Sequence, residues 1–130
     1  MTEVTLPSGA RVRGRRLGAP ATPVDLAVVL GAGPLPPWPA RRVRWPDFGL
    51  PRDRADARAA FAEAHRLATS GVRVEVVCGG GRGRTGTALA CIAQLAGVAP
   101  ADAVCWVRER YDARAVETPW QRRYVLRFTA

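Results

Sequence analysis

The sequence contains no lysine, a single histidine and no apolar run of membrane-spanning length. Nothing approaches the ~18 apolar residues of a transmembrane helix, and the first residues lack the basic-then-apolar order of a signal peptide. We therefore expect a cytoplasmic protein without a membrane span. Three cysteines, Cys78, Cys91 and Cys105, have neither the even count of a disulfide framework nor the close pairing of a zinc site. No metal site is expected.

Because lysine is absent, all 20 cations are arginine, and with 11 acids they give a formal net charge of +9. This charge favours acidic partners, although a genome rich in G and C explains the basicity equally well. The arginines are scattered and not gathered in one run, so nucleic-acid binding is not expected. The length of 130 residues fits one domain, residues 1–130, and the 48% apolar content is that of a folded globular protein.

The pattern of apolar residues alternates between strand-like and helix-like segments, which predicts an α/β domain with a central, partly parallel sheet flanked by helices. Residues 1–16 have the alternation and the Pro-Ser-Gly turn of an N-terminal hairpin. Cys105 and Cys91 fall on apolar helix faces, where we expect them in the core. The expected strands are 24–30, 41–45 and 72–77; the expected helices are 53–69, 88–96, 100–111 and one that begins at Thr118 with a capping box.

A glycine-rich turn, CGGGRGRTGT, joins the last expected strand to the helix that follows it. Such a turn points successive backbone N–H groups at an anion, and the helix dipole adds to their effect. Its glycines permit positive φ and remove side chains that would block a phosphate-sized ligand. A nucleotide-binding P-loop is excluded because no lysine follows. We expect a phosphate-binding loop over residues 78–85, with Gly79, Gly80, Gly81, Arg82, Gly83 and Arg84 around the anion.

The same turn is suited to a cysteine nucleophile. Backbone amides, a helix N-terminus and arginines favour the thiolate form of a cysteine in the position of Cys78. A thiolate that attacks phosphorus also needs the phosphoryl oxygens held, and Arg84 offers a bidentate guanidinium. The leaving oxygen needs a proton, which predicts a carboxylic acid on another loop.

Cys78, Arg84 and Thr85 spell C-x5-R-[ST], which resembles the signature of the cysteine-based protein tyrosine and dual-specificity phosphatases. That family takes its general acid from a movable Trp-Pro-Asp loop upstream of the cysteine, and residues 45–49 read Trp-Pro-Asp-Phe-Gly. The resemblance implies a small phosphatase-like fold and a phosphomonoester hydrolase that works through a phosphocysteine, without a cofactor. Its partner would be a phosphorylated protein or a small phosphomonoester.

By matching position, the resemblance gives each site residue a role. Cys78 would be the nucleophile, Arg84 would bind the phosphoryl group, and Asp47 would protonate the leaving oxygen and later activate water. The Thr85 hydroxyl would assist breakdown of the intermediate. Gln121 resembles the glutamine that positions this water, although it also suits the capping box.

One position departs from the family. Val77 stands immediately before the cysteine, where the family usually has histidine, so the thiolate would depend on loop amides, the helix dipole and the arginines. Several alternatives stay open. Arg82, between two glycines of the loop, is at a position that is often basic in lipid-directed members, so a phosphoinositide or another small polyanion is an alternative substrate. A non-catalytic phosphate-binding or nucleic-acid-binding module and a sulfur-transfer or arsenate-reducing enzyme are the others.

Overall fold

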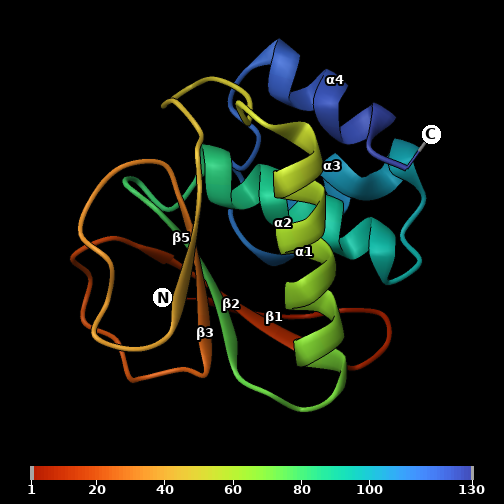
Figure 1. The fold of residues 1–130 in the computed structure, drawn as a ribbon. Coiled ribbons are helices and arrows are strands. Elements are labelled where there is room, and N and C mark those ends of the chain that lie inside the picture. The colour runs from red at the N-terminus through yellow and green to blue at the C-terminus, as the bar shows by residue number, and fades with distance from the viewer. Residues whose placement is uncertain (1, 130) are drawn as a thin grey trace.

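The computed structural model describes residues 2–129, which form one five-stranded sheet with helices on one of its faces (Figure 1). The sheet order is β1-β2-β5-β3-β4, and only β1 and β2 pair antiparallel. The expected α/β fold with a partly parallel sheet is thus confirmed. The strands are β1 (Thr2–Thr5), β2 (Arg11–Arg16), β3 (Leu26–Leu30), β4 (Ala40–Val43) and β5 (Val74–Cys78); the helices are α1 (Arg54–Thr69), α2 (Gly83–Leu95), η1 (Pro100–Asp102), α3 (Ala103–Arg110) and α4 (Pro119–Arg127).

The central strand β5 carries Cys78 to the edge where the parallel strands end. β5 lies between β2 and β3, and its register places Cys78 opposite Arg16 and Val77 opposite Val29. Side chains alternate across the sheet, so Val74, Val76 and Cys78 belong to the core beneath the helices. Open α/β sheets place their ligands at this carboxyl edge.

Helix α1 forms where the sequence pattern predicted a helix. Asp53 caps it, because its side chain accepts a hydrogen bond from the Asp56 backbone N–H at 3.0 Å. Its buried residues are mostly alanines, which bring the helix close to the sheet, with Phe61 as the one large core side chain. The capping box expected at Thr118 is confirmed at the start of α4.

Helix α2 begins at Gly83, five residues earlier than the sequence pattern predicted. The Thr87 hydroxyl donates to the Gly83 carbonyl at 2.7 Å, and the Gly86 N–H donates to the Arg82 carbonyl. A side chain at Gly86 would collide with Ala115, so glycine permits close packing of this first turn. The apolar pattern does not mark the first turn of α2. The glycines of this turn allow neighbouring backbone to pack closely, and its other residues belong to the candidate site. The last two residues of the C-x5-R-[ST] motif therefore lie on the helix itself.

The two cysteines outside the loop differ in their surroundings. Cys91 is buried in α2, and burial raises the pKa of its thiol well above the usual value. The prediction that Cys105 lies in the core is wrong: it is exposed on α3, and its thiol donates to the Glu109 carboxylate at 3.3 Å. α3 buries only a narrow face, namely Ala103, Val104 and Val107, and Cys105 points away from it.

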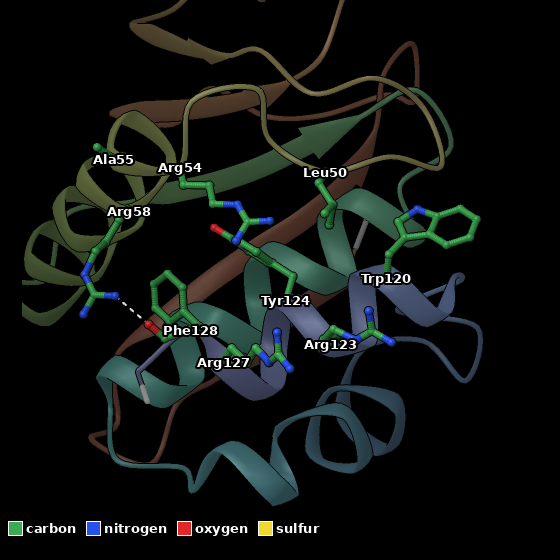
Figure 2. Close-up of a pocket in the computed structure, with 9 residues that line it drawn as sticks. All are labelled: Leu50, Arg54, Ala55, Arg58, Trp120, Arg123, Tyr124, Arg127 and Phe128. Atoms are coloured by element: carbon green, nitrogen blue, oxygen red, sulfur yellow. Dashed lines mark hydrogen bonds between the residues drawn. The ribbon is translucent and has the colours of Figure 1, made fainter.

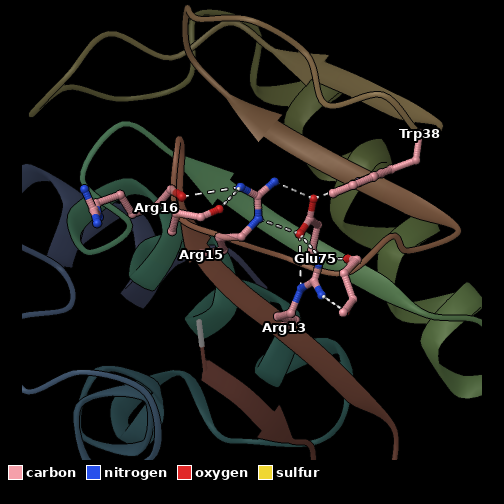
Figure 3. Close-up of polar contacts among 7 residues, drawn as sticks. Arg13, Arg15, Arg16, Trp38 and Glu75 are labelled. Carbon is pink, nitrogen blue, oxygen red and sulfur yellow. Dashed lines mark hydrogen bonds and ion pairs between the residues drawn. The ribbon is translucent and has the colours of Figure 1, made fainter.

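The sheet face opposite the helices holds a buried charge cluster (Figure 3). Glu75 on β5 is fully buried between Arg13 and Arg15 of β2, and Arg15 donates to both of its oxygens at 2.9 Å. The Trp38 indole N–H, from the loop before β4, donates to the same carboxylate at 3.0 Å. Burial alone would raise the pKa of Glu75, but hydrogen bonds from Arg15, Arg13 and Trp38 outweigh it and lower the pKa.

Candidate active site

The phosphate loop, residues 78–85, turns sharply after β5, so that the backbone of the loop passes over the Cys78 thiol. The Gly81 N–H donates to the Cys78 sulfur at 3.1 Å, and the thiol is buried. Gly81 has φ +70°, which the turn requires, and a Cβ there would collide with the Arg16 backbone. The N-terminus of α2 follows directly, so its free N–H groups and its dipole add to the positive potential around the sulfur.

Arg84 joins the phosphate loop to the loop that carries Asp47. Its side chain is 9% exposed; Nη1 donates to the Trp45 carbonyl at 2.9 Å and Nη2 lies 3.5 Å from Asp47 Oδ1. Two further polar atoms, Arg84 Nε and Thr85 Oγ1, are buried without a hydrogen-bond partner within residues 2–129. Buried polar atoms are rarely unpaired, so these two donors are available to an additional acceptor.

Asp47 lies in a turn that leaves its carboxyl accessible. Its side chain is 66% exposed, and Oδ1 accepts a hydrogen bond from the Phe48 N–H at 3.0 Å. The turn is closed by the Gly49 N–H, which donates to the Pro46 carbonyl, and Phe48 adopts φ 58°, an uncommon value for a bulky residue. The structure therefore brings Asp47 and Arg84, 37 residues apart in sequence, to the same place.

Gln121 is fully buried, and both ends of its amide are in use. Oε1 accepts from the N–H groups of Glu117 and Thr118 at 3.0 and 3.3 Å, while Nε2 donates to the Gly49 carbonyl at 3.1 Å. In this arrangement Gln121 anchors the Asp47 loop to α4. A role in positioning water stays a prediction.

Arg82 lies at the rim of the loop and is half-exposed. Its Nε lies 3.7 Å from the Asp112 carboxylate, an exposed ion pair that partly neutralises its charge. Arg16, at the end of β2, is also exposed, and its backbone lies beside Gly81. A role for Arg82 toward a second anionic group stays a prediction.

Gly31, at the end of β3, has a part in the site that the sequence pattern did not reveal. It adopts φ +93°, and a Cβ there would collide with Nη1 of Arg84 and with the Trp45 carbonyl. Only glycine leaves room for the guanidinium at this point. It directly follows the expected strand 24–30, and a glycine at that point was the only signal in the sequence.

Tyr111 is the second residue that sequence reasoning missed. Its hydroxyl donates to the Gly81 carbonyl, and its ring packs against β2 where Gly14 leaves space that a side chain would fill. Burial raises the pKa of Tyr111, and the neighbouring Cys78 and Asp112 raise it further. A glycine inside a strand often marks the close approach of another group. Gly14 was therefore the signal in the sequence for a side chain that packs against β2.

Tyr111→Phe should lower kcat/KM for an aryl phosphate by about fivefold to tenfold, the value of one hydrogen bond that orients the Gly81 peptide. Because the raised pKa keeps the hydroxyl protonated, the loss should be constant over the neutral and mildly alkaline range. Tyr124→Phe is the matched control, since its hydroxyl makes no hydrogen bond to the loop within residues 2–129. Equal losses in the two variants would contradict a positioning role.

Neither a metal cluster nor a spanning helix is found in the part of the chain that the structure describes. Between residues 2 and 129, no three His, Cys, Asp or Glu side chains lie close enough to hold a metal ion together. None of the helices in that range combines the length and apolarity needed to cross a bilayer.

The sequence matches, over residues 50–126, the family described as "Swiss Army Knife protein, DSP-PTPase phosphatase domain". The chain belongs to this family. The match includes the loop from Cys78 to Thr85 and Gln121, whereas Asp47 precedes it. This confirms the predicted membership of the dual-specificity phosphatase superfamily.

Two uncharacterized proteins of Methanocaldococcus jannaschii are similar in sequence. MJECL20 is 40% identical over 83 residues, which cover 63% of this chain and 54% of that protein. MJ0215 is 39% identical over 83 residues, which cover 63% of this chain and 50% of that protein. The chain spans about half the length of these curated relatives.

Solved phosphatase structures share the fold of this family member. The active form of Tk-PTP superposes with a TM-score of 0.67 at 24% identity, covering 79% of this chain and 76% of that one. Kinase-associated phosphatase, with serine in place of its catalytic-site cysteine, gives 0.67 at 19% identity over 78% and 66% of the two chains. PTPMT1 gives 0.64 at 17% identity over 81% and 75%. These identities show the fold alone.

Proposed function

We propose that the domain hydrolyses phosphomonoesters through a phosphocysteine formed on Cys78. The observation that carries the proposal is the Arg84 guanidinium, which lies between the Trp45 carbonyl and the Asp47 carboxylate while its buried Nε has no hydrogen-bond partner among the described residues 2–129. A phosphoryl oxygen would satisfy this Nε, and the N–H groups at the start of α2 would hold the others.

In the first step, the Cys78 thiolate attacks phosphorus. The S–P bond forms as the bond from phosphorus to the leaving oxygen breaks, and Asp47 transfers its proton to that oxygen. Charge on the equatorial oxygens is stabilised by Arg84 and the loop amides, which are already oriented in the folded protein. Asp47 is exposed enough to meet a leaving group.

In the second step, water attacks the phosphocysteine. Asp47, now a carboxylate, takes a proton from the water, the S–P bond breaks and inorganic phosphate leaves with the thiolate restored. The Thr85 hydroxyl lies on the first turn of α2 beside the loop, buried and without a hydrogen-bond partner in the part of the chain that the structure describes. It would donate to the departing sulfur.

We favour a protein tyrosine or dual-specificity substrate. A small polyanion such as an inositol phosphate is the second candidate, because Arg16 and Arg82 are both exposed at the rim of the loop. Comparing kcat/KM for a phosphotyrosine peptide with that for inositol polyphosphates separates the two.

Aryl phosphates with leaving groups of different basicity, assayed in EDTA, test the mechanism. Asp47→Asn should lower kcat by about 10²-fold for a poorly activated phenyl phosphate, because the leaving oxygen then departs unprotonated. The loss should shrink for a strongly acidic phenol, which needs no proton. A loss that is the same for every leaving group would contradict the role of Asp47 as general acid.

Rapid quenching with a ³²P-labelled substrate tests the nucleophile. Wild type should yield a protein-bound phosphate that is absent from Cys78→Ser and retained in Cys105→Ser, which removes the exposed thiol on α3. Turnover that persists in Cys78→Ser would overturn the proposal. A silent wild type that still binds tungstate would favour a phosphate-binding module without catalysis.

A further inference from the structure

A second cationic feature lies outside the phosphate loop, between helices α1 and α4 (Figure 2). A groove of about 430 Å³ runs between them, with Leu50, Tyr124 and Phe128 as its apolar lining. Trp120 lies at the end nearest the Asp47 loop, where its indole N–H donates to the Phe48 carbonyl at 2.6 Å. The hydrolytic mechanism does not use this groove.

Four arginines line the groove, two on each helix and each pair one turn apart. Arg54 and Arg58 come from α1, and Arg123 and Arg127 come from α4. None of the four forms an ion pair with a carboxylate within residues 2–129, and no acidic residue lines the groove. Like charges one helical turn apart repel each other. The arrangement is therefore complementary to an anionic partner.

The α1 pair is held in place by the aromatic floor. The Arg54 guanidinium lies 5.7 Å from the Tyr124 ring centroid, and the Arg58 guanidinium lies 4.9 Å from that of Phe128. Arg58 also donates to the Phe128 carbonyl at 2.6 Å. These contacts leave other N–H donors of each guanidinium free to meet an acceptor and reduce the side-chain entropy lost when one binds.

We propose that this groove docks an extended acidic segment of another protein. Side chains on one side of an extended chain recur every ~6.6 Å, close to the ~5–6 Å between residues one helical turn apart. Carboxylates at alternate positions can therefore meet Arg123 and Arg127 in turn, while an apolar side chain between them meets the floor. A segment docked there lies next to the loop that holds Asp47.

The depth of the apolar lining favours a peptide over a membrane surface. Trp120, at one end of the groove, is 49% exposed, but Tyr124 and Phe128 are 8% and 7% exposed and cannot insert into a bilayer, whereas a narrow chain can enter between the helices. Helix-in-groove and extended-chain docking both combine apolar anchors with charge complementarity. The spacing of the arginines fits carboxylates at alternate positions of an extended chain.

A fluorescent peptide of about ten residues, with glutamate at alternate positions and leucine between them, is the probe. Its binding to the full chain is measured by anisotropy at several salt concentrations, against a peptide with glutamine in place of glutamate. The groove variant is Arg123→Gln/Arg127→Gln. The matched control, Arg66→Gln/Arg122→Gln, removes the same charge from exposed positions of α1 and α4 outside the groove. Thermal unfolding verifies that both variants are folded.

We expect the groove variant to bind the acidic peptide about tenfold more weakly than wild type, and the control variant to bind it within about twofold. The glutamine peptide should bind wild type as weakly as the groove variant binds the acidic one. Equal losses in the two variants would overturn the proposal, since net charge alone would then explain binding. Phosphatidylserine vesicles that bind through the groove where the peptide does not would also overturn it. Neither outcome depends on turnover, so the proposed hydrolysis stands or fails separately.

Discussion

Exchange of Arg84 for lysine should lower kcat/KM for an aryl phosphate by about 10³-fold. The guanidinium makes two contacts, a hydrogen bond to the Trp45 carbonyl and an ion pair with Asp47, and its buried Nε has no hydrogen-bond partner within residues 2–129. A lysine ammonium keeps the charge but cannot form this planar set of bonds. It therefore loses the bidentate hold on the phosphoryl oxygens and the link to the Asp47 loop together.

Two further measurements test whether the loss in Arg84→Lys comes from weaker binding of the oxyanion. Tungstate affinity should fall along with kcat/KM, because the same donors bind the ground-state oxyanion. Arg66→Lys, an exposed exchange on α1, should leave both quantities unchanged. If Arg84→Lys keeps more than about a tenth of wild-type kcat/KM, the site does not require the planar, bidentate hydrogen bonding of a guanidinium.

Glu75→Gln should lower the free energy of unfolding by about 3–5 kcal/mol. Glu75 is fully buried and accepts hydrogen bonds from Arg13, Arg15 and Trp38. The neutral amide leaves two buried guanidinium groups without a counter-charge, and removing one partner of a buried ion cluster costs far more than breaking an exposed pair. Chemical denaturation measures the change. Glu63→Gln, which breaks a partly exposed ion pair with Arg41, is the control and should cost less than about 1 kcal/mol.

The same cluster predicts a pH dependence of stability. The pKa of Glu75 is lowered in the folded state, so its contribution is complete above the ordinary glutamate pKa of about 4.3. It is lost as pH falls below that value and through the folded pKa. Wild type should therefore lose stability more steeply than Glu75→Gln below about pH 4.3. Parallel slopes for the two proteins would contradict the stabilising ion cluster.

The residues of the candidate site were predictable because short motifs name them. Cys78, Arg84 and Thr85 lie within eight positions, and a strand followed by glycines and a helix is a local arrangement that needs no tertiary information. Asp47 followed from a second motif. Boundaries were less predictable: α2 begins at Gly83, where apolar periodicity is absent, and Cys105 is exposed because α3 buries only a narrow face.

The sequence by itself determined the fold class and the family and named the residues of the candidate site, because periodicity, turns and short motifs are local properties of the chain. The tertiary structure alone decided which distant groups complete them. Tyr111 meets Gly81 across 30 positions, Arg84 meets the Trp45 carbonyl across 39, and Arg15 meets Glu75 across 60. Such pairs leave no periodic signal in one sequence, since their partners are brought together only when the sheet and the helices pack. The arginine-lined groove is the same case, because its two helices lie far apart along the chain and become neighbours on one face of the sheet.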